Sequence, residues 1–201
     1  MSDSDAIANA GTTPGEYGVT PSKVTLAEAL IGGAWNVQGD PRQASFVARA
    51  KDVSGVALPL EPNTTAQGDH VSAFWLGPRS WLLVAGREGA LADFAVKRDL
   101  LNQAGGALFD VSAARIAWTV SGAGAARVLQ KTCPLDLHPR VFPAGHCAQS
   151  LLGHIGALVY RPDEDSRFVV WVARSFAAEA WTRLAVAAMA DGYRSDGADV
   201  A

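Results

Sequence analysis

Two segments decide the fold, FWLGPRSWLLV at residues 74–84 and LVYRPDEDSRFVVWV at residues 158–172. Each consists of two apolar runs joined by a short stretch rich in turn-forming residues, which is the pattern of a β-hairpin. Each is followed by a segment in which apolar residues recur every three or four positions, at 88–104 and at 175–190. This spacing predicts a helix after each hairpin.

The order strand, hairpin, helix therefore occurs twice along the chain. This indicates an α+β protein built from duplicated ferredoxin-like units with antiparallel sheets. We expect a first α+β half at 23–107 and a second at 108–192, flanked by a flexible N-terminal tail at 1–22 and a C-terminal tail at 193–201. The N-terminal residues are small and polar, and they bury too little apolar area to offset the entropy of ordering.

Outside these segments the pattern is weaker. It predicts a short helix at 24–30, a loop at 31–41, a strand at 46–50, a strand at 108–120, a helix at 122–131 and a strand at 147–160. In the last helix Ser175 is the expected N-cap, and Glu179 is expected to pair with Arg183 one turn later. Its inward face is predicted to contain Phe176, Ala180, Leu184 and Ala187.

The hairpin strands are apolar on both faces, as at 168–172, 74–76 and 81–84. Helices in a ferredoxin-like unit cover only one face of the sheet, so something else must cover the second face. Either the other half of the chain covers it, or part of it remains as an apolar contact surface for a partner. The sequence leaves both explanations open.

Composition excludes several classes of function. Of the 201 residues 49% are hydrophobic and 18% charged, and a net charge of −3 without any run of Lys or Arg argues against nucleic acid as a partner. The chain lacks an apolar stretch of the roughly 18 residues that a membrane span needs, and its first residues do not form a signal peptide. With two cysteines, it is expected to be a reduced, cytoplasmic protein.

Four residues in one region resemble a metal set at first sight: Cys133, His138, His146 and Cys147. Their spacing matches no zinc pattern, and adjacent residues on a strand point to opposite faces, which argues against a nucleophilic Cys–His pair. Cys147 is better explained as a small hydrophobic residue at the end of a strand.

Other candidates also have structural explanations. Ser121–Gly124 lacks the third glycine of a dinucleotide fingerprint and the Lys of a P-loop, so close packing of a strand and a helix is favoured. Asp110 and Arg115, with Ser112 between them, are expected to form a buried structural pair. Arg174 and Ser175 could hold an anion at a helix start, but an ordinary N-cap is favoured. The tryptophans are expected in cores or contact surfaces: Trp35, Trp75, Trp81, Trp118, Trp171 and Trp181.

From these residues we predict no catalytic, no cofactor-binding and no metal-binding residue in this chain. Asp110 and Asp136 are the only carboxylates considered as an anchor for a pterin ring.

Three segments together are similar to the gamma subunit family of heterotetrameric sarcosine oxidase: 74–86, FDVSAARIAWTVSGAGAARVLQKTCPLDL at 109–137, and VVWVARSFAAEAWTRL at 169–184. The similarity covers about residues 45–190 and leaves the N-terminal tail unmatched. It implies a fold resembling the folate-binding domain of the glycine-cleavage T protein, which agrees with the duplication inferred above.

The resemblance also implies a function. The family's enzyme demethylates sarcosine oxidatively to glycine, producing hydrogen peroxide and, with tetrahydrofolate, 5,10-methylenetetrahydrofolate. The resemblance implies that the alpha and beta subunits hold FAD, FMN, NAD and tetrahydrofolate, that the delta subunit holds zinc, and that the gamma subunit is a non-catalytic part of the heterotetramer. The alternative is an independent folate-binding aminomethyltransferase-like protein.

Overall fold

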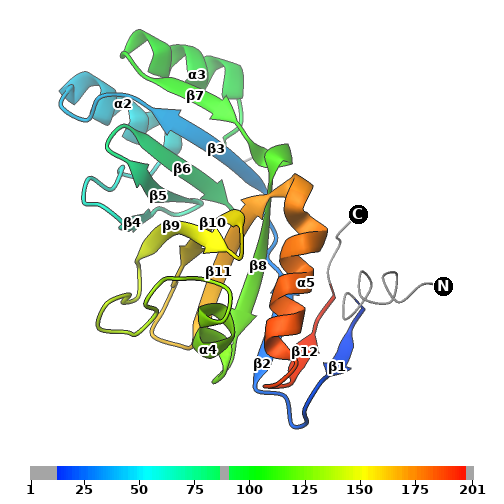
Figure 1. Ribbon diagram of the computed structural model, residues 1–201. Coiled ribbons are helices and arrows are strands. Elements are labelled where there is room, and N and C mark those ends of the chain that lie inside the picture. The colour runs from blue at the N-terminus through cyan, green and yellow to red at the C-terminus, as the bar shows by residue number, and fades with distance from the viewer. Residues whose placement is uncertain (1–12, 87–90, 198–201) are drawn as a thin grey trace. The chain divides into compact units, whose positions relative to one another are not determined.

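The computed structural model describes residues 13–86 and 91–197, which form two units with a sheet and a hydrophobic core each (Figure 1). Within the described residues, unit 1 combines those up to 29 with 116–144 and those from 148 onward. Unit 2 consists of 30–115 and 145–147. The N-terminal segment therefore belongs to the same unit as the C-terminal half of the chain.

Unit 2 contains a five-stranded sheet in which the spatial order is β4-β5-β6-β3-β7 and the neighbouring strands are antiparallel. Its elements in chain order are β3 (Gly33–Gln38), α2 (Ala44–Ser54), β4 (Thr65–Gln67), β5 (Val71–Gly77), β6 (Ser80–Ala85), α3 (Phe94–Gln103) and β7 (Ala107–Asp110). Without the edge strand β4, this is the βαββαβ topology of a ferredoxin-like fold.

Unit 1 contains a seven-stranded sheet in the order β1-β12-β2-β8-β11-β10-β9. Its elements are β1 (Gly15–Tyr17), β2 (Val24–Glu28), β8 (Arg115–Ser121), α4 (Ala125–Gln130), β9 (Cys147–Leu152), β10 (Ile155–Tyr160), β11 (Arg167–Ala173), α5 (Ala177–Ala188) and β12 (Tyr193–Ser195). Short 3-10 helices precede β8 at Ser112–Ala114 and α5 at Arg174–Phe176.

The two units repeat one another element by element. The series β3-α2-β4-β5-β6-α3-β7 of unit 2 matches β8-α4-β9-β10-β11-α5-β12 of unit 1, and both sheets follow the same strand order. The difference is that β2 is inserted between β12 and β8, and β1 is added at the edge. The duplicated α+β fold predicted from the hairpins is thus confirmed.

Each core lies between a sheet and its helices. In unit 1 the indole rings of Trp118 on β8 and Trp181 on α5 meet edge to face with centroids 5.2 Å apart, and Leu184 packs in the same core with no exposed surface. In unit 2 Phe46 of α2 meets Trp81 of β6 at 5.9 Å. These contacts fix the helices on their sheets.

Three local predictions are wrong. The expected strand at 46–50 is part of α2, where Phe46, Ala50 and Val53 recur with helical spacing on the buried face. The expected helix at 24–30 is strand β2, which pairs with β8 on one side and β12 on the other. The expected loop at 31–41 contains β3, a strand between β6 and β7.

The glycines that suggested a loop there have a packing role. A Cβ atom on Gly33 would lie 2.3 Å from the ring of Trp35, and one on Gly39 would lie 2.3 Å from the ring of Phe46. Glycine is present because an aromatic ring covers its Cα.

Two predicted long strands are each divided. The segment 108–120 contains β7, a 3-10 turn and β8, and 147–160 is a hairpin of β9 and β10 that turns at Gly153, with φ of +65°. Apart from the short segment 145–147, which belongs to unit 2, the units divide at 29/30 and 115/116, whereas the sequence placed the halves at 23–107 and 108–192.

The expected tails also contain structure where they are described. β1 at 15–17 pairs with β12 at 193–195, so the inner ends of both predicted tails form strands. The remainder of those tails, 1–12 and 198–201, lies outside the described residues. The described part of the chain has no helix of the length and hydropathy that crossing a membrane requires.

Candidate functional site

The cysteine and histidine candidates do not form a metal centre among residues 13–86 and 91–197, where no cluster of three or more potential ligands occurs. Cys133 is buried in unit 1, with its Sγ 3.6 Å from the Oγ of Ser150. His138 accepts a backbone hydrogen bond from Arg140 at its Nδ1, 3.2 Å away. Both side chains thus have local structural partners.

Cys147 lies in an environment that suppresses the thiolate. It is buried, and its Sγ lies 3.5 Å from the carbonyl oxygen of Thr64 and 3.7 Å from that of Trp75. Burial raises the pKa of the Cys147 thiol to about 12. A nucleophilic cysteine needs the opposite shift, so the geometry supports the structural explanation.

The glycine-rich turn Ser121–Gly124 packs β8 and α4 against the start of β2. A Cβ atom on Gly122 would lie 2.6 Å from the carbonyl oxygen of Lys23, and the N–H of Gly124 donates to that same oxygen at 3.1 Å. Because the turn is filled by backbone and one of its amides is already used, it does not fit a phosphate group. Close strand-to-helix packing is confirmed.

Asp110 is exposed, which contradicts the expected buried pair with Arg115. Its Oδ1 accepts from the backbone N–H of Ser112 at 2.9 Å and from the Ser112 hydroxyl at 2.6 Å. The Ser112 Oγ also accepts from the N–H of Ala34 at 2.9 Å. These bonds fasten the turn after β7 to β3, which is a structural role.

The predicted N-cap at Ser175, which was favoured over an anion site at Arg174 and Ser175, is wrong. Both residues belong to the 3-10 turn, and α5 begins after Phe176, without a capping side chain. Phe176 itself is 42% exposed, so its prediction as an inward residue is wrong, whereas Ala180, Leu184 and Ala187 are buried as predicted.

The tryptophans lie in the interior, as expected. Trp75 is half-buried, and the other five are at most 6% exposed: Trp35, Trp81, Trp118, Trp171 and Trp181. On the hairpins, Phe74, Leu82 and Trp171 are likewise at most 4% exposed. These side chains leave little exposed apolar surface on the hairpins.

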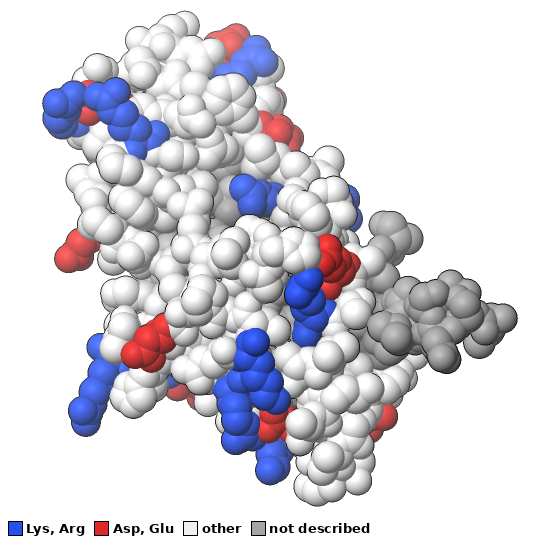
Figure 2. Space-filling view, viewed as in Figure 1, with Lys and Arg blue, Asp and Glu red and all other residues white. Residues whose placement is uncertain are grey.

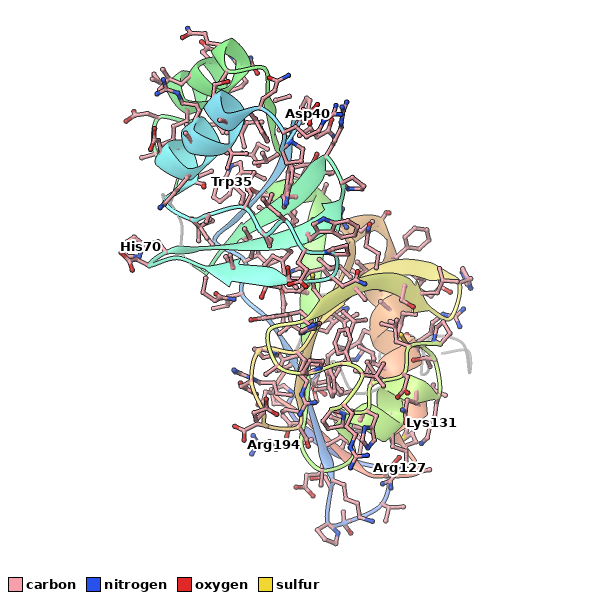
Figure 3. All side chains as sticks on the ribbon, turned by 90° about the vertical axis from the view of Figure 1, so that its left-hand side faces the viewer. Trp35, Asp40, His70, Arg127, Lys131 and Arg194 are labelled. Atoms are coloured by element: carbon pink, nitrogen blue, oxygen red, sulfur yellow. The ribbon has the colours of Figure 1, made fainter. Side chains whose placement is uncertain are left out.

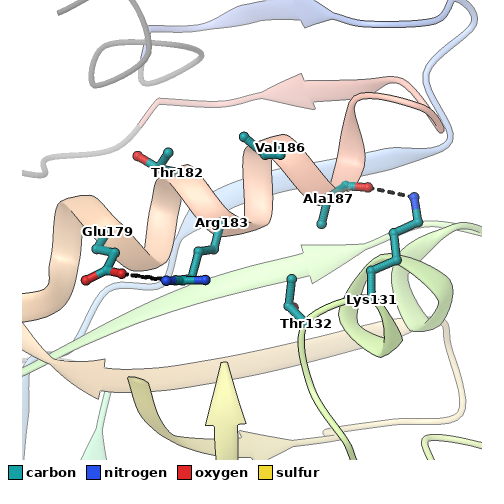
Figure 4. Close-up of a pocket in the computed structure, with 7 residues that line it drawn as sticks. All are labelled: Lys131, Thr132, Glu179, Thr182, Arg183, Val186 and Ala187. Atoms are coloured by element: carbon teal, nitrogen blue, oxygen red, sulfur yellow. Dashed lines mark hydrogen bonds and ion pairs between the residues drawn. The ribbon is translucent and has the colours of Figure 1, made fainter. Parts of the chain in front are cut away.

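An apolar groove of unit 1 was not predicted from the sequence. It has a volume of about 470 Å³ and follows the outer side of α5 (Figure 4), where it is lined by Thr182, Val186 and Ala187 of α5, by Lys131 and Thr132 after α4, and by Glu179 and Arg183 at one end. We call it the α5 groove. A signal existed in the sequence, because Val186 interrupts the polar face of an amphipathic helix.

One end of the α5 groove carries a balanced charge cluster. Arg183 donates to Glu179 at 2.7 Å, which confirms the predicted pair, and also to the Nδ1 of His154 at 2.8 Å. The Nε2 of His154 lies 3.1 Å from the same Glu179 carboxylate. The hydrogen bond from Arg183 is the main reason that the pKa of Glu179 is lowered.

Lys131, at the other end of the groove, shares a carboxylate with Arg127 of α4 outside the lining. Asp191, 7% exposed, accepts from the Nζ of Lys131 at 2.8 Å and from the Nε of Arg127 at 2.8 Å. The hydrogen bond from Lys131, followed by that from Arg127, lowers the pKa of Asp191. Lys131 also donates to the carbonyl oxygen of Ala187 at 2.7 Å, at the C-terminal end of α5. Figure 3 shows Arg127 and Lys131 side by side at α4.

The charged groups beside the α5 groove are paired with one another. The carboxylates at both ends are held ionised by cations, so neither is placed to deliver a proton near neutral pH. On the face shown in Figure 2, positive and negative side chains lie in small mixed groups on a largely uncharged surface.

Comparison with known proteins gives a consistent result. A family model described as the sarcosine oxidase, gamma subunit family matches residues 38–190. The sarcosine oxidase subunit gamma of Corynebacterium sp. (strain U-96) is 35% identical over 163 residues, which cover 80% of this chain and 75% of the relative. The protein of the same name from Arthrobacter sp is 32% identical over 154 residues, covering 76% and 74%.

Solved structures agree with the sequence comparison. A chain of the heterotetrameric sarcosine oxidase from Corynebacterium sp. U-96, in complex with pyrrole 2-carboxylate, matches with a TM-score of 0.78 and 29% identity over 92% of this chain and 91% of that one. The glycine cleavage system aminomethyltransferase T from Bartonella henselae matches with a TM-score of 0.60 and 16% identity over 82% of this chain and 46% of that one. The second likeness concerns the fold alone.

Proposed function

The chain belongs to the sarcosine oxidase gamma subunit family, and from this premise we propose that it is the gamma subunit of a heterotetrameric sarcosine oxidase. Within that complex it has a structural, non-catalytic role. The observation that carries the proposal is the match to a chain of a heterotetrameric sarcosine oxidase over nine-tenths of both chains, which includes both ferredoxin-like units.

The reaction requires chemistry that lies in the partner subunits under this proposal. Oxidation of the N-methyl group of sarcosine to glycine and hydrogen peroxide needs a flavin, and capture of the carbon unit as 5,10-methylenetetrahydrofolate needs a folate site. We assign FAD, FMN, NAD and tetrahydrofolate to the alpha and beta subunits and zinc to the delta subunit. This chain contributes no catalytic, cofactor-binding or metal-binding residue.

Two features of the chain support a role without chemistry. The buried thiol of Cys147 has a pKa of about 12, and the turn at Gly122 is filled by the backbone of Lys23. A cytoplasmic location belongs to the same proposal, because Cys133 and Cys147 are both free thiols.

Copurification tests the proposal. An affinity-tagged copy of this chain, expressed with the other subunits from the same source, is expected to retain them in stoichiometric amounts. The retained complex should show the visible absorbance of flavin and oxidise sarcosine, while the chain expressed alone should be colourless. Purification of the chain without partners from a lysate that contains the other subunits would contradict the proposal.

The independent folate-binding alternative is not favoured, because the relatives with substantial identity are gamma subunits and the likeness to aminomethyltransferase T concerns the fold alone. Titration of the isolated chain with tetrahydrofolate separates the two functions. The structural role predicts no saturable heat of binding, whereas saturable binding at micromolar concentrations would support the alternative.

A further inference from the structure

Exposed apolar side chains gather along the C-terminal half of α5. Val186 is 63% exposed and Met189 is 41% exposed one turn later. Val19, 55% exposed, is adjacent, because its N–H donates to the carbonyl oxygen of Met189 at 3.4 Å. Val186 lines the α5 groove, and Met189 and Val19 lie next to its C-terminal end; we call these three exposed side chains the apolar strip, since exposed apolar groups mark contact surfaces.

This strip is not needed for folding. The opposite face of α5 already places Trp181 and Leu184 in the core of unit 1 with no exposed surface. A helix in water gains nothing from a second apolar face, so the strip suggests a partner that covers it.

The groove favours a helix as its occupant. Its lining comes from α5 and from the residues that follow α4, and helical backbone is already hydrogen-bonded internally. The carbonyl oxygen of Ala187 at the end of α5 is used by Lys131. An extended segment would find few backbone partners here, whereas a helix satisfies its own.

The charges beside the α5 groove indicate which side chains the docked helix carries. Arg127 and Lys131 share the single carboxylate of Asp191, so this end of the groove has one positive charge in excess, and the Arg127 side chain is 58% exposed. At the other end, the Arg183 guanidinium is matched by the Glu179 carboxylate. A partner that fits has apolar side chains for the strip and an acidic side chain near Arg127.

We propose that the α5 groove and its apolar strip dock an amphipathic helix of another subunit of the oxidase, with an acidic residue placed against Arg127. The proposal rests on the proposed function and specifies its contact. Assembly therefore depends on the outer face of α5 in unit 1.

Cysteine labelling tests the location of the contact. Val186→Cys places a reactive thiol in the groove, and Val96→Cys is a matched control on α3, since Val96 is 59% exposed on a helix of unit 2. The native thiols are buried and provide a low background. In the assembled complex, the thiol at position 186 is expected to react with a maleimide at least tenfold more slowly than in the isolated chain, while the thiol at 96 is unchanged.

Equal labelling of position 186 in the complex and in the isolated chain would overturn the proposal and leave the proposed function intact. Failure of the wild-type chain to copurify with the other subunits would instead refute the function. Protection of position 186 in the isolated chain through self-association would identify a second copy as the occupant, and would also overturn the proposal.

Affinity measurements test the chemistry of the contact. Val186→Ala is expected to weaken assembly about five- to tenfold, given the area that this side chain would bury, and Val186→Glu more strongly. Arg127→Gln should weaken assembly about two- to fivefold and reduce its sensitivity to salt. Val96→Glu should change neither. Assembly that is indifferent to Val186→Glu, in a variant with wild-type circular dichroism, would refute the groove as the docking site.

Discussion

Replacement of two neighbouring residues of α5 should separate folding from assembly. Leu184 has no exposed surface and lies in the unit 1 core, whereas Val186, two residues later, is 63% exposed. The variants Leu184→Ala and Val186→Ala remove similar apolar groups from opposite faces of the same helix. If the assignment of the two faces is right, Leu184→Ala should lower the stability of unit 1 and Val186→Ala should weaken its assembly with the partner subunits.

The structure gives the magnitudes. Leu184→Ala removes buried methyl groups and leaves a cavity beside Trp181, so unit 1 should lose about 3 kcal/mol of unfolding free energy, within the range of about 2.7–5 for buried leucines. Val186→Ala removes no core contact, and alanine is the better helix former by about 0.5 kcal/mol. This variant should therefore be as stable as the wild type or slightly more stable.

Hydrogen exchange of the peptide that spans 177–188 is a suitable assay, because it reports the opening of α5 even when the two units unfold separately. The opening free energy should fall by about 3 kcal/mol in Leu184→Ala and by no more than about 0.5 kcal/mol in Val186→Ala. The affinity of the folded chain for the partner subunits should instead fall more in Val186→Ala than in Leu184→Ala. Similar losses of stability in both variants would refute the assignment of faces.

Three further outcomes follow from single sites. Gly192→Ala should destabilise the chain by several kcal/mol, because φ is +67° and a Cβ atom would lie 1.6 Å from the carbonyl oxygen of Val19. Gly55→Ala, at φ of +73° with open space around it, should lose only about 1 kcal/mol of unfolding free energy. Thermal unfolding compares the two variants, and equal losses would contradict the close approach at Gly192. The thiol of Cys147, with a pKa of about 12, should resist iodoacetamide at pH 8 until the chain is unfolded, and modification at the rate of a free thiol would show that it is accessible as the thiolate. The carboxyl of Asp191 has a lowered pKa in the folded state, so it stabilises the fold above its unfolded pKa of about 4 and loses this effect as the pH falls through the folded pKa. The urea midpoints of wild type and Asp191→Asn should therefore differ at pH 7 and converge as the pH falls toward 3. A difference between the midpoints that does not change with pH would refute the ion pairs of Asp191 as its cause.

The parts of the fold that could be predicted are those fixed by neighbours in the sequence. The hairpin of β5 and β6 depends on two apolar runs and the turn between them, and α5 depends on a helical repeat with Leu184 inward. The pair of Glu179 and Arg183 follows from helical spacing alone. Such features need no information about distant parts of the chain.

The parts that failed depend on distant partners. The segment 24–28 becomes strand β2 because β8 and β12, about a hundred or more residues later, provide its hydrogen-bonding partners. β3 begins at Gly33 and is followed by Gly39, which suggested a loop, yet it is held between β6 and β7, and Trp35 packs over Gly33. Local propensity is weak in such segments, and pairing in the sheet overrides it.

The α5 groove was missed for a different reason. The helical pattern predicted the inward residues of α5 and the pair of Glu179 and Arg183, and no contact surface was predicted on its outer face. Val186 and Met189 lie on that outer face, and the adjacent Val19 comes from a segment predicted to be a flexible tail. No local pattern places Val19 beside Met189, so the extent of the strip required the structure.

Apolar surface indicates a partner only when the chain itself leaves it uncovered. The hairpin strands first suggested a contact surface because they are apolar on both faces, yet Phe74, Leu82 and Trp171 are at most 4% exposed in this chain. Their burial already contributes to folding and leaves little for a partner to gain. Val186, at 63% exposed on a helix with a complete inner face, still has most of its hydrophobic free energy available for binding. For this reason the outer face of α5, and not the hairpins, is where the other subunits of the oxidase should contact this chain.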